Sequence, residues 1–340
     1  MVRVVVRNWR CIEDIEVDLG TVTLLIGKNS SGKSSLAYAL YFLAKVVEWK
    51  DANNVLKHLY GVDLDGVVRV DGSGKRHYPI VIEVDGYRFE AHGKDRVESP
   101  RGSPWKSSYL LPATRVALTK IMQFVAVFAR ELLKRPESRA ALPFMYGLFE
   151  LVKNVPLLPP TYFFLEDLMR LYGITQYHKV KVGDLGALVE MFSPLIVLVS
   201  YEYTDLFTNI KLPLHLAPEG FIDSIIIQRF VERAREGSLV VVEEPEIHKN
   251  PLWLIDLVKN IVRISVERKL TLVMTTHSDI LLHAVAKAVE EGRISPEQVS
   301  VYYLYRDSQR VWSRARKLKV YEDGTFEELP GVEEVVSKLF

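Results

Sequence analysis

Four residues, Gly27, Gly32, Lys33 and Ser34, have the types and the spacing of a phosphate-binding loop, Gly-x-x-x-x-Gly-Lys-Ser. Glycines let the backbone curl so that successive N–H groups point at one anion. In such loops the lysine reaches the β- and γ-phosphates, and the serine hydroxyl can ligate Mg²⁺. We therefore predict a nucleotide site formed by the residues of this loop: Gly27, Lys28, Asn29, Ser30, Ser31, Gly32, Lys33, Ser34 and Ser35.

The flanking residues supply the elements that such a loop needs. An apolar run at residues 22–26 predicts a buried strand before the loop, and a second apolar run at residues 36–43 predicts a helix after it. A bare glycine-lysine pattern also occurs by chance in loops, whereas the order strand, loop, helix is typical of a true phosphate site.

A second group of candidate catalytic and metal-binding residues follows two later apolar runs. Glu243 and Glu244 end the run at residues 239–242, and His277 follows the run at residues 270–275. Acids at the carboxyl edge of a parallel sheet, beside a phosphate loop, lie where Mg²⁺ and an attacking water are needed. Two acids at the end of a buried strand have no obvious structural use without a cation. The same strand order places His277 on the edge that carries Glu244.

Composition limits the class of protein. The chain has 340 residues, 48% hydrophobic residues and a net charge of +1, which fits one large or two ordinary globular domains and argues against a globally basic nucleic-acid binder. No apolar run approaches the length of a membrane span. The single cysteine, Cys11, cannot form an internal disulfide, and the first residues do not form a secretory signal. We therefore expect a cytoplasmic protein.

The order of these motifs resembles that of the SMC-like and OLD-like branch of ABC-type ATPases, often labelled AAA-family ATPases. The resemblance begins with a strand, Asn8-Trp9-Arg10, a second strand and the glycine loop. It continues with Glu-Glu-Pro-Glu at residues 243–246, which resembles the Walker B and D-loop segments, and with Thr-His-Ser-Asp at residues 276–279. The resemblance implies an α/β P-loop NTPase with a mixed, largely parallel central sheet, flanking helices, a small antiparallel β subdomain and an inserted helical lobe.

The resemblance also implies roles for single residues. ATP and Mg²⁺ would be the ligands, with Glu243 and Ser34 holding the metal. Glu244 would orient the attacking water, and His277 would sense the γ-phosphate. Arg10 is a candidate contact for the base or the α-phosphate, with a solvent-facing arginine as the open alternative. Arg115, in a strand-Pro-Ala-x-Arg segment, would face the nucleotide or a partner subunit.

Differences in periodicity and composition along the chain predict three parts. Residues 1–115 would form the first half of the ATPase core, with a hairpin at Asp85-Gly86. Residues 116–194 would form the helical lobe, including a helix at residues 184–192. Residues 195–340 would form the second half of the core, beginning with two returning strands. No heptads persist long enough for a coiled-coil arm, and we expect no TOPRIM nuclease domain.

One segment departs from the resembled family. Ala-Pro-Glu-Gly at residues 217–220 opens a helix where the family carries its signature, normally with serine before glycine. In the family this segment contacts the γ-phosphate of ATP held by the other subunit. Gly220 suits that role, but the carboxylate of Glu219 would repel a phosphate unless Mg²⁺ or a basic group intervened. ATP-driven dimerisation and turnover are therefore left open.

The densest basic cluster lies near the end of the chain. A solvated edge strand and a DNA-binding surface explain it equally well. The sequence favours an ATP-dependent homodimer acting in DNA repair or defence, alone or with a separately encoded nuclease or other partner. The alternatives are a slow or inactive nucleotide-controlled binding module for a protein partner and, with least support, a transporter subunit. The basic residues are Arg306, Arg310, Arg314, Arg316, Lys317 and Lys319.

Overall fold

The computed structural model describes residues 1–120, 160, 162–164, 166–167, 178–182, 187–191, 201–205, 208–213, 216–306 and 311–328. At its centre is a six-stranded sheet with the order β17-β16-β3-β15-β14-β9. Neighbouring strands are parallel except for β17, which is antiparallel to β16. The predicted mixed, largely parallel sheet is therefore confirmed. Its strands are β3 (Val22–Ile26), β9 (Ser108–Leu111), β14 (Leu239–Glu243), β15 (Thr271–Thr276), β16 (Val299–Tyr305) and β17 (Arg314–Leu318).

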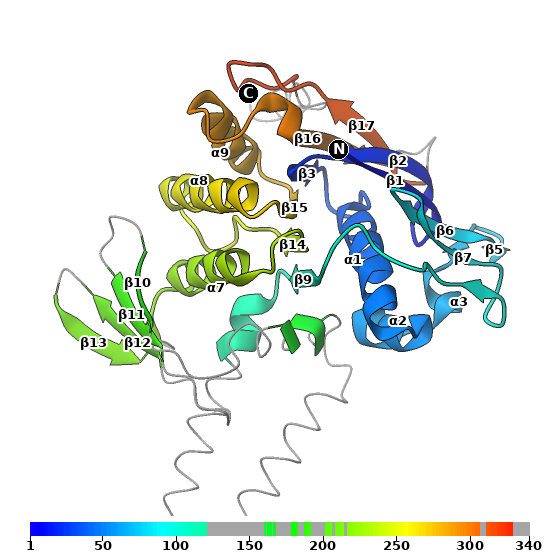
Figure 1. Ribbon diagram of the computed structural model, residues 1–340, viewed down its shortest axis with the longest axis horizontal. Coiled ribbons are helices and arrows are strands. Elements are labelled where there is room, and N and C mark those ends of the chain that lie inside the picture. Colours follow the sequence, from blue (N-terminus) through cyan, green and yellow to red (C-terminus); the bar gives the residue numbers. More distant parts are fainter. Residues whose placement is uncertain are drawn as a thin grey trace, which may run out of the picture.

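Helices cover both faces of this sheet (Figure 1). Strand side chains alternate between the two faces, so that Leu25 and Val241 pack towards α1 while Leu24 and Val242 pack towards α7, α8 and α9. This double burial explains why the strands are continuous apolar runs. The helices on one face are α1 (Lys33–Trp49), α2 (Ala52–Tyr60) and α3 (Leu64–Val67), and those on the other are α7 (Glu219–Arg233), α8 (Pro251–Glu267) and α9 (Asp279–Glu290).

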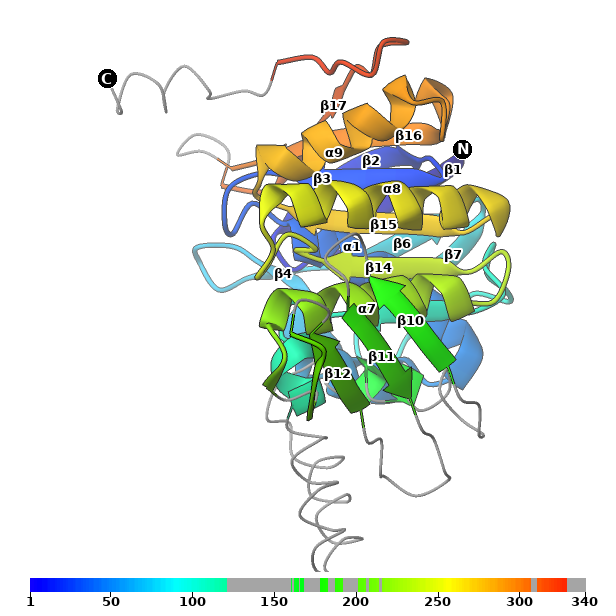
Figure 2. The same ribbon diagram turned by 90° about the vertical axis from the view of Figure 1, so that its left-hand side faces the viewer.

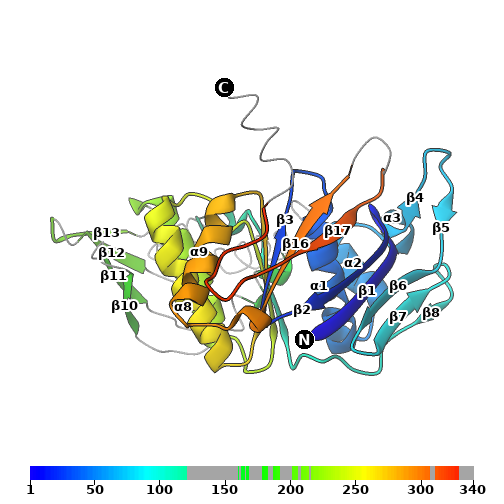
Figure 3. The same ribbon diagram turned by 90° about the horizontal axis from the view of Figure 1, so that it is seen from above.

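A second, antiparallel sheet packs on the far side of α1 with the order β2-β1-β6-β7-β8 (Figure 3). Trp9 and Phe89 from this sheet contact Phe42 of α1, with ring centroids 5.1 and 4.9 Å apart. The predicted hairpin is present, because Asp85 (φ 47°) and Gly86 (φ 82°) join paired strands. The strands are β1 (Val2–Trp9), β2 (Ile12–Leu19), β6 (Ile80–Val84), β7 (Tyr87–Ala91) and β8 (Val97–Glu98), beside the short pair β4 (Arg69–Val70) and β5 (Arg76–His77).

A third sheet corrects two predictions. It consists of β10 (His178–Val182), β11 (Ala187–Met191), β12 (Tyr201–Asp205) and β13 (Ile210–Pro213), all antiparallel, and it lies beside α7 (Figure 2). The helix predicted for residues 184–192 is wrong, because a short apolar run fits either period and pairing with β10 and β12 favours the strand. The two strands expected to return to the central sheet pair in this separate sheet instead. Residues 121–159 and 168–177 of the predicted lobe lie outside the described residues.

The described chain ends beside β17. Val320 pairs with Phe326 across a turn at Asp323-Gly324, which closes a short hairpin. A 3₁₀ helix, η3 (Pro296–Gln298), precedes β16. None of the helices in the described part of the chain has the length and apolar character needed to cross a membrane.

Candidate functional site

The glycine loop connects β3 to α1 in the conformation that its sequence predicts. A β-carbon at Gly27 would lie 2.2 Å from the carbonyl oxygen of Leu304 on β16, so no larger residue fits there. Gly32 has φ 104° and caps α1, which begins at Lys33. The loop backbone is therefore pressed against the next strand, with the helix N-terminus and its partial positive charge at the end of the loop.

Lys33 folds back across the loop. Its Nζ donates hydrogen bonds to the carbonyl oxygens of Gly27 (2.7 Å) and Lys28 (3.0 Å). Burial lowers the pKa of Lys33, while the negative charges of Glu244, Glu246 and Glu243 act in the opposite direction. The ammonium group thus lies between the loop carbonyls and the acids of β14, where a phosphate anion would offer it stronger partners.

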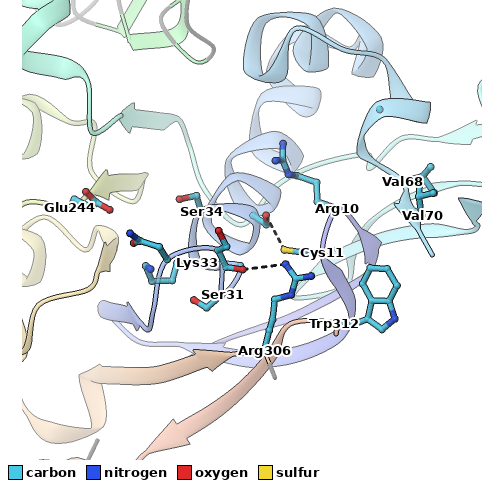
Figure 4. A pocket seen from close by; sticks show the side chains of 15 residues that line it. Arg10, Cys11, Ser31, Lys33, Ser34, Val68, Val70, Glu244, Arg306 and Trp312 are labelled. Carbon is cyan, nitrogen blue, oxygen red and sulfur yellow. Dashed lines mark hydrogen bonds between the residues drawn. The ribbon is translucent and has the colours of Figure 1, made fainter. Parts of the chain in front are cut away.

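A cavity of about 690 Å³ opens in front of the loop (Figure 4). Its volume is within the range of small-molecule sites. The hydroxyl of Ser31 is buried in the loop without a hydrogen-bond partner, as expected for a group that awaits a ligand atom. The cavity is lined by Arg10, Cys11, Asn29, Ser30, Ser31, Gly32, Lys33, Ser34, Ser35, Gly66, Val68, Val70, Glu244, Arg306 and Trp312.

Two arginines from outside the loop reach this cavity. The guanidinium of Arg10 lies 4.5 Å from the ring centroid of Tyr60, which fixes its position by a cation–π contact. Arg306 follows β16 and donates from Nη1 to the carbonyl oxygen of Ser30 (3.3 Å). The sequence placed Arg306 only in the terminal basic cluster. Its position directly after a strand that neighbours β3 is the signal that could have placed it here.

The acids of β14 lie beside the loop. Glu243 is 9% exposed, and its Oε2 accepts hydrogen bonds from the hydroxyl of Tyr38 (2.6 Å) and the backbone N–H of Ala113 (3.4 Å). Burial, and then the charge of Glu243, raise the pKa of Tyr38 well above its ordinary value. Glu244 has a left-handed backbone (φ 43°), and its side chain lines the cavity.

The end of β15 brings His277 to the same place. Its Nδ1 is 3.5 Å from Oε1 of Glu244 and 3.6 Å from Oε1 of Glu246. Glu246 in turn accepts hydrogen bonds from the Thr276 hydroxyl (2.5 Å) and the His277 backbone N–H (3.3 Å). Glu244 and His277, 33 positions apart in the sequence, are thus brought together at the sheet edge. Neither His277 nor Glu243 lines the cavity in front of the loop.

The start of α7 lies outside that cavity. Glu219 forms an ion pair with Lys120 (Oε1 to Nζ, 2.6 Å), and its Oε2 lies 3.2 Å from Nδ1 of His248. The hydrogen bond from Lys120 lowers the pKa of Glu219. A β-carbon at Gly220 would lie 2.2 Å from the carbonyl oxygen of His248. The helix therefore begins directly against the segment that follows Glu244, and a basic group does accompany the unexpected carboxylate.

Arg115 corrects an expectation. It faces neither a nucleotide nor an open surface, because its side chain is completely buried and paired with the equally buried Asp223 of α7. The side chain of Lys249 contacts the same carboxylate. The sequence reading missed Asp223 and Lys249. The only local signal is that Asp223 interrupts an apolar run on α7, where an acid needs a buried partner.

The terminal basic cluster is partly compensated within the chain. Arg314 pairs with Glu13 (3.0 Å) and Arg316 with Glu327. Lys317 and Lys319 lie 5.9 and 4.8 Å from the ring centroids of Tyr302 and Tyr321. Arg310 lies outside the described residues. The positive surface is therefore smaller than the sequence alone indicates.

Comparison with known proteins agrees with this geometry. Residues 1–77 match the AAA ATPase domain family. The structure is similar to an Smc head solved in complex with the C-winged helix domain of ScpA, with a TM-score of 0.52 and 9% identity over 94% of this chain and 98% of that one. Among proteins of curated function, none matched the sequence.

Two further heads are more distant. An Smc head with an extended coiled coil, bound to the C-terminal domain of ScpA and derived from Pyrococcus furiosus, has a TM-score of 0.49 at 9% identity, covering 100% of both chains. The SMC head of Thermotoga maritima has a TM-score of 0.42 at 9% identity, covering 94% of this chain and 98% of that one. With its AAA ATPase match at residues 1–77, the chain thus has the α/β fold of an SMC-type ATPase head.

Proposed function

We propose that this protein binds and hydrolyses ATP in a Mg²⁺-dependent reaction at the glycine loop of residues 27–35. One observation carries the proposal: the carboxylate of Glu244, from the end of β14, lines the same cavity as Lys33 and the loop backbone. A phosphate-binding loop facing an acid that can hold a water is the arrangement that phosphoryl transfer to water requires.

The residues present fit a magnesium ion. Ser34, at the first turn of α1, and Glu243, at the end of β14, would hold it. Mg²⁺ commonly takes one or two protein carboxylates and completes its shell with water and substrate phosphates, so this donor set suffices. When bound, the ion neutralises charge that develops on the transferring phosphate. Tyr38 and the Ala113 N–H fix the Glu243 carboxylate in place for this role.

Each remaining residue has a task that its position supports. Lys33 exchanges its two carbonyl partners for the β- and γ-phosphates. Glu244 accepts a hydrogen bond from the attacking water and orients it. His277, within 3.6 Å of two carboxylates, is held at the edge where the γ-phosphate would lie. Arg10, fixed on Tyr60, would contact the base or the α-phosphate.

The same proposal includes an ATP-dependent homodimer. In it, Gly220 and the start of α7 contact the nucleotide of the second subunit. The Glu219 carboxylate would by itself repel the phosphate of that nucleotide. Its ion pair with Lys120 offsets this negative charge. We also keep the division into residues 1–115, 116–194 and 195–340 and the cytoplasmic location as parts of this proposal.

The physiological role that we propose is DNA repair or defence, with a separately encoded nuclease or another partner. The surface of β17 and the residues after it would contact the phosphate backbone. Because such binding releases counterions, its affinity should fall steeply as salt rises. Binding that is absent, or insensitive to salt, would remove DNA from the proposal and leave the ATPase part intact.

A second candidate function is a slow or inactive nucleotide-controlled module that acts on a protein partner. Glu219 favours it, since this carboxylate stands where the resembled family has its signature serine. Protein docking suits the fold, because a similar Smc head was solved bound to a domain of ScpA.

The deciding experiment measures mass in solution for the Glu244→Gln variant, with and without Mg²⁺-ATP, beside the turnover of the wild-type protein. We expect multiple wild-type turnovers per minute, no turnover by Glu244→Gln, and a dimer of the variant only when ATP is present. A monomer with ATP demonstrably bound would favour the nucleotide-controlled module. Failure to bind ATP at all would refute the proposal.

A further inference from the structure

Arg115 uses all of its hydrogen-bond donors on one carboxylate and three backbone carbonyl groups. A guanidinium has five N–H donors in a rigid fork. Two of them reach Asp223, from Nε to Oδ1 (2.5 Å) and from Nη2 to Oδ2 (2.8 Å). The other three reach backbone carbonyl oxygens of Pro112 (3.0 Å), Glu243 and Glu244 (3.1 Å). The side chain therefore connects α7 with the backbone at the end of β14.

Asp223 fixes the orientation of this fork. It lies in the first turns of α7, four residues after Glu219, and is completely buried. Its second cation, Lys249, belongs to the segment that follows the Glu-Glu-Pro-Glu motif and also donates to the Ile247 carbonyl (3.3 Å). Because a buried carboxylate with two cations cannot reorient without losing an ion pair, the guanidinium is held in one position.

The backbone that Arg115 holds is the unusual part of the site. Glu244 adopts φ 43°, a left-handed conformation that costs a non-glycine residue on the order of 1–2 kcal/mol. Both of its backbone polar groups are hydrogen-bonded: the N–H donates to the Thr275 carbonyl (2.9 Å), and the C=O accepts from Arg115 (3.1 Å) and from the Ile247 N–H (3.2 Å). Such a conformation persists only where the surroundings enforce it, and it directs the Glu244 side chain to the cavity.

We propose that Arg115, held by Asp223, is a positioning residue for Glu244: it enforces the left-handed turn that presents this carboxylate to the attacking water. The inference rests on the proposed ATPase function. It also implies that the first turns of α7 and the water-orienting acid are mechanically connected, because one side chain contacts both.

The test uses the full-length protein and two substitutions. In Arg115→Lys the charge stays, but a single ammonium has three donors at one point and cannot contact Asp223 and three carbonyls together. In Asp223→Asn the shape stays and the charge that orients Arg115 is lost. We expect kcat for ATP to fall at least tenfold in both variants, while the dissociation constant for ATP in the presence of Mg²⁺ changes less than twofold.

A matched control comes from a different buried ion pair. Lys45 of α1 is completely buried against Asp167 (3.5 Å) and contacts neither Glu243 nor Glu244. Lys45→Arg should lower the midpoint of unfolding without lowering kcat. A merely structural Arg115 would instead behave like this control, with stability lost and the kcat of the folded fraction retained.

The outcomes separate the two proposals. A wild-type protein without ATPase activity refutes the proposed function itself. A wild-type ATPase whose Arg115→Lys and Asp223→Asn variants fold, bind ATP and retain kcat overturns only the positioning role. Unfolding of both variants also overturns it, because Arg115 would then serve the fold alone. A selective loss of kcat in either folded variant, absent from Lys45→Arg, supports it.

Discussion

Two clusters of buried charge lie on opposite faces of the central sheet. The edge cluster, Arg115, Asp223 and Lys249, lies on the α7 side at the carboxyl end of β14. The base cluster, Lys45 and Asp167, lies on the α1 side, three turns beyond Lys33 and roughly 18 Å along the helix axis from it. Both are nearly free of solvent, yet only the edge cluster hydrogen-bonds the backbone of Glu243 and Glu244.

The comparison shows that burial of charge does not by itself indicate a functional role. Asp167 accepts hydrogen bonds from the Leu110 N–H (3.2 Å) and the Tyr41 hydroxyl (3.4 Å), so the base cluster joins α1 to β9 and to the residues around position 167. These contacts hold the layers together. The edge cluster makes the same kinds of contact, but with the backbone that directs the Glu244 side chain to the cavity. The neighbours of a buried charge, not its burial, decide its role.

The largest effect should come from removing the anion of the edge cluster. We expect Asp223→Ala to lower the free energy of unfolding by about 3–5 kcal/mol, because two buried cations, Arg115 and Lys249, lose their carboxylate. Asp167→Ala should cost less, because Lys45 keeps its hydrogen bond to Glu48 (3.1 Å). Urea denaturation at neutral pH measures both losses. A loss below about 1 kcal/mol in Asp223→Ala would mean that water reaches the edge cluster.

The two clusters should also respond oppositely to pH. Burial outweighs the attraction of Lys45 and raises the pKa of Asp167 to about 7 from 3.8. Because the folded state keeps the proton longer than the unfolded state, the contribution of Asp167 is present below pH 4 and is lost as pH rises through 7. At about 1.4 kcal/mol per pKa unit, the stability lost between pH 4 and pH 7 amounts to about 4 kcal/mol.

Lys249 has the opposite sign. Burial lowers the pKa of Lys249 to about 8 from 10.5, so the unfolded state binds the proton between these values. Its contribution is lost as pH falls through 8 and returns as pH rises towards 10.5, by about 3 kcal/mol. Urea denaturation at pH 4–7 and pH 8–10 should therefore give slopes of opposite sign. Asp167→Asn should flatten the first and Lys249→Met the second, and an unchanged slope in either variant would contradict that assignment.

The same comparison explains what the sequence could predict. Three features are local patterns: the glycine loop, the acids after residues 239–242, and His277. Each directly follows, in the sequence, the strand that positions it. Strand order then brings Glu244 and His277 to one edge. The edge cluster is not local: Arg115 lies 108 positions from Asp223 and contacts carbonyls 128 and 129 positions away. Asp223 in the apolar run of α7 indicates a buried partner, but no nearby residue identifies Arg115 as that partner.

The remaining errors have similar causes. The periodicity of residues 184–192 predicts a helix, and only pairing with β10 and β12 makes Ala187–Met191 a strand. Arg306 belongs by sequence to a basic cluster, and it reaches the cavity only because β16 neighbours β3. The strand at Ala187–Met191 and the position of Arg306 both depend on contacts between segments that are distant along the chain. Periodicity and composition carry no information about such contacts.

The smallest expected effect compares two left-handed residues, one near each cluster. Lys50 (φ 58°) caps α1 a few residues beyond Lys45, and Glu244 (φ 43°) is held by Arg115. Glycine adopts this backbone without the steric cost of a β-carbon. We expect Lys50→Gly and Glu244→Gly each to raise the free energy of unfolding by about 1 kcal/mol, measured by urea denaturation.

The rate of ATP hydrolysis should differ completely between the Lys50→Gly and Glu244→Gly variants. Lys50→Gly should keep the wild-type kcat, because its left-handed turn only ends a helix. Glu244→Gly should abolish ATP hydrolysis while stabilising the fold. This result would mean that the protein tolerates the backbone strain at position 244 because hydrolysis needs the carboxylate. If Glu244→Gly instead lowers stability, the Glu244 side chain itself supports the sheet edge through its contact with His277, and the turn is not held by Arg115 alone.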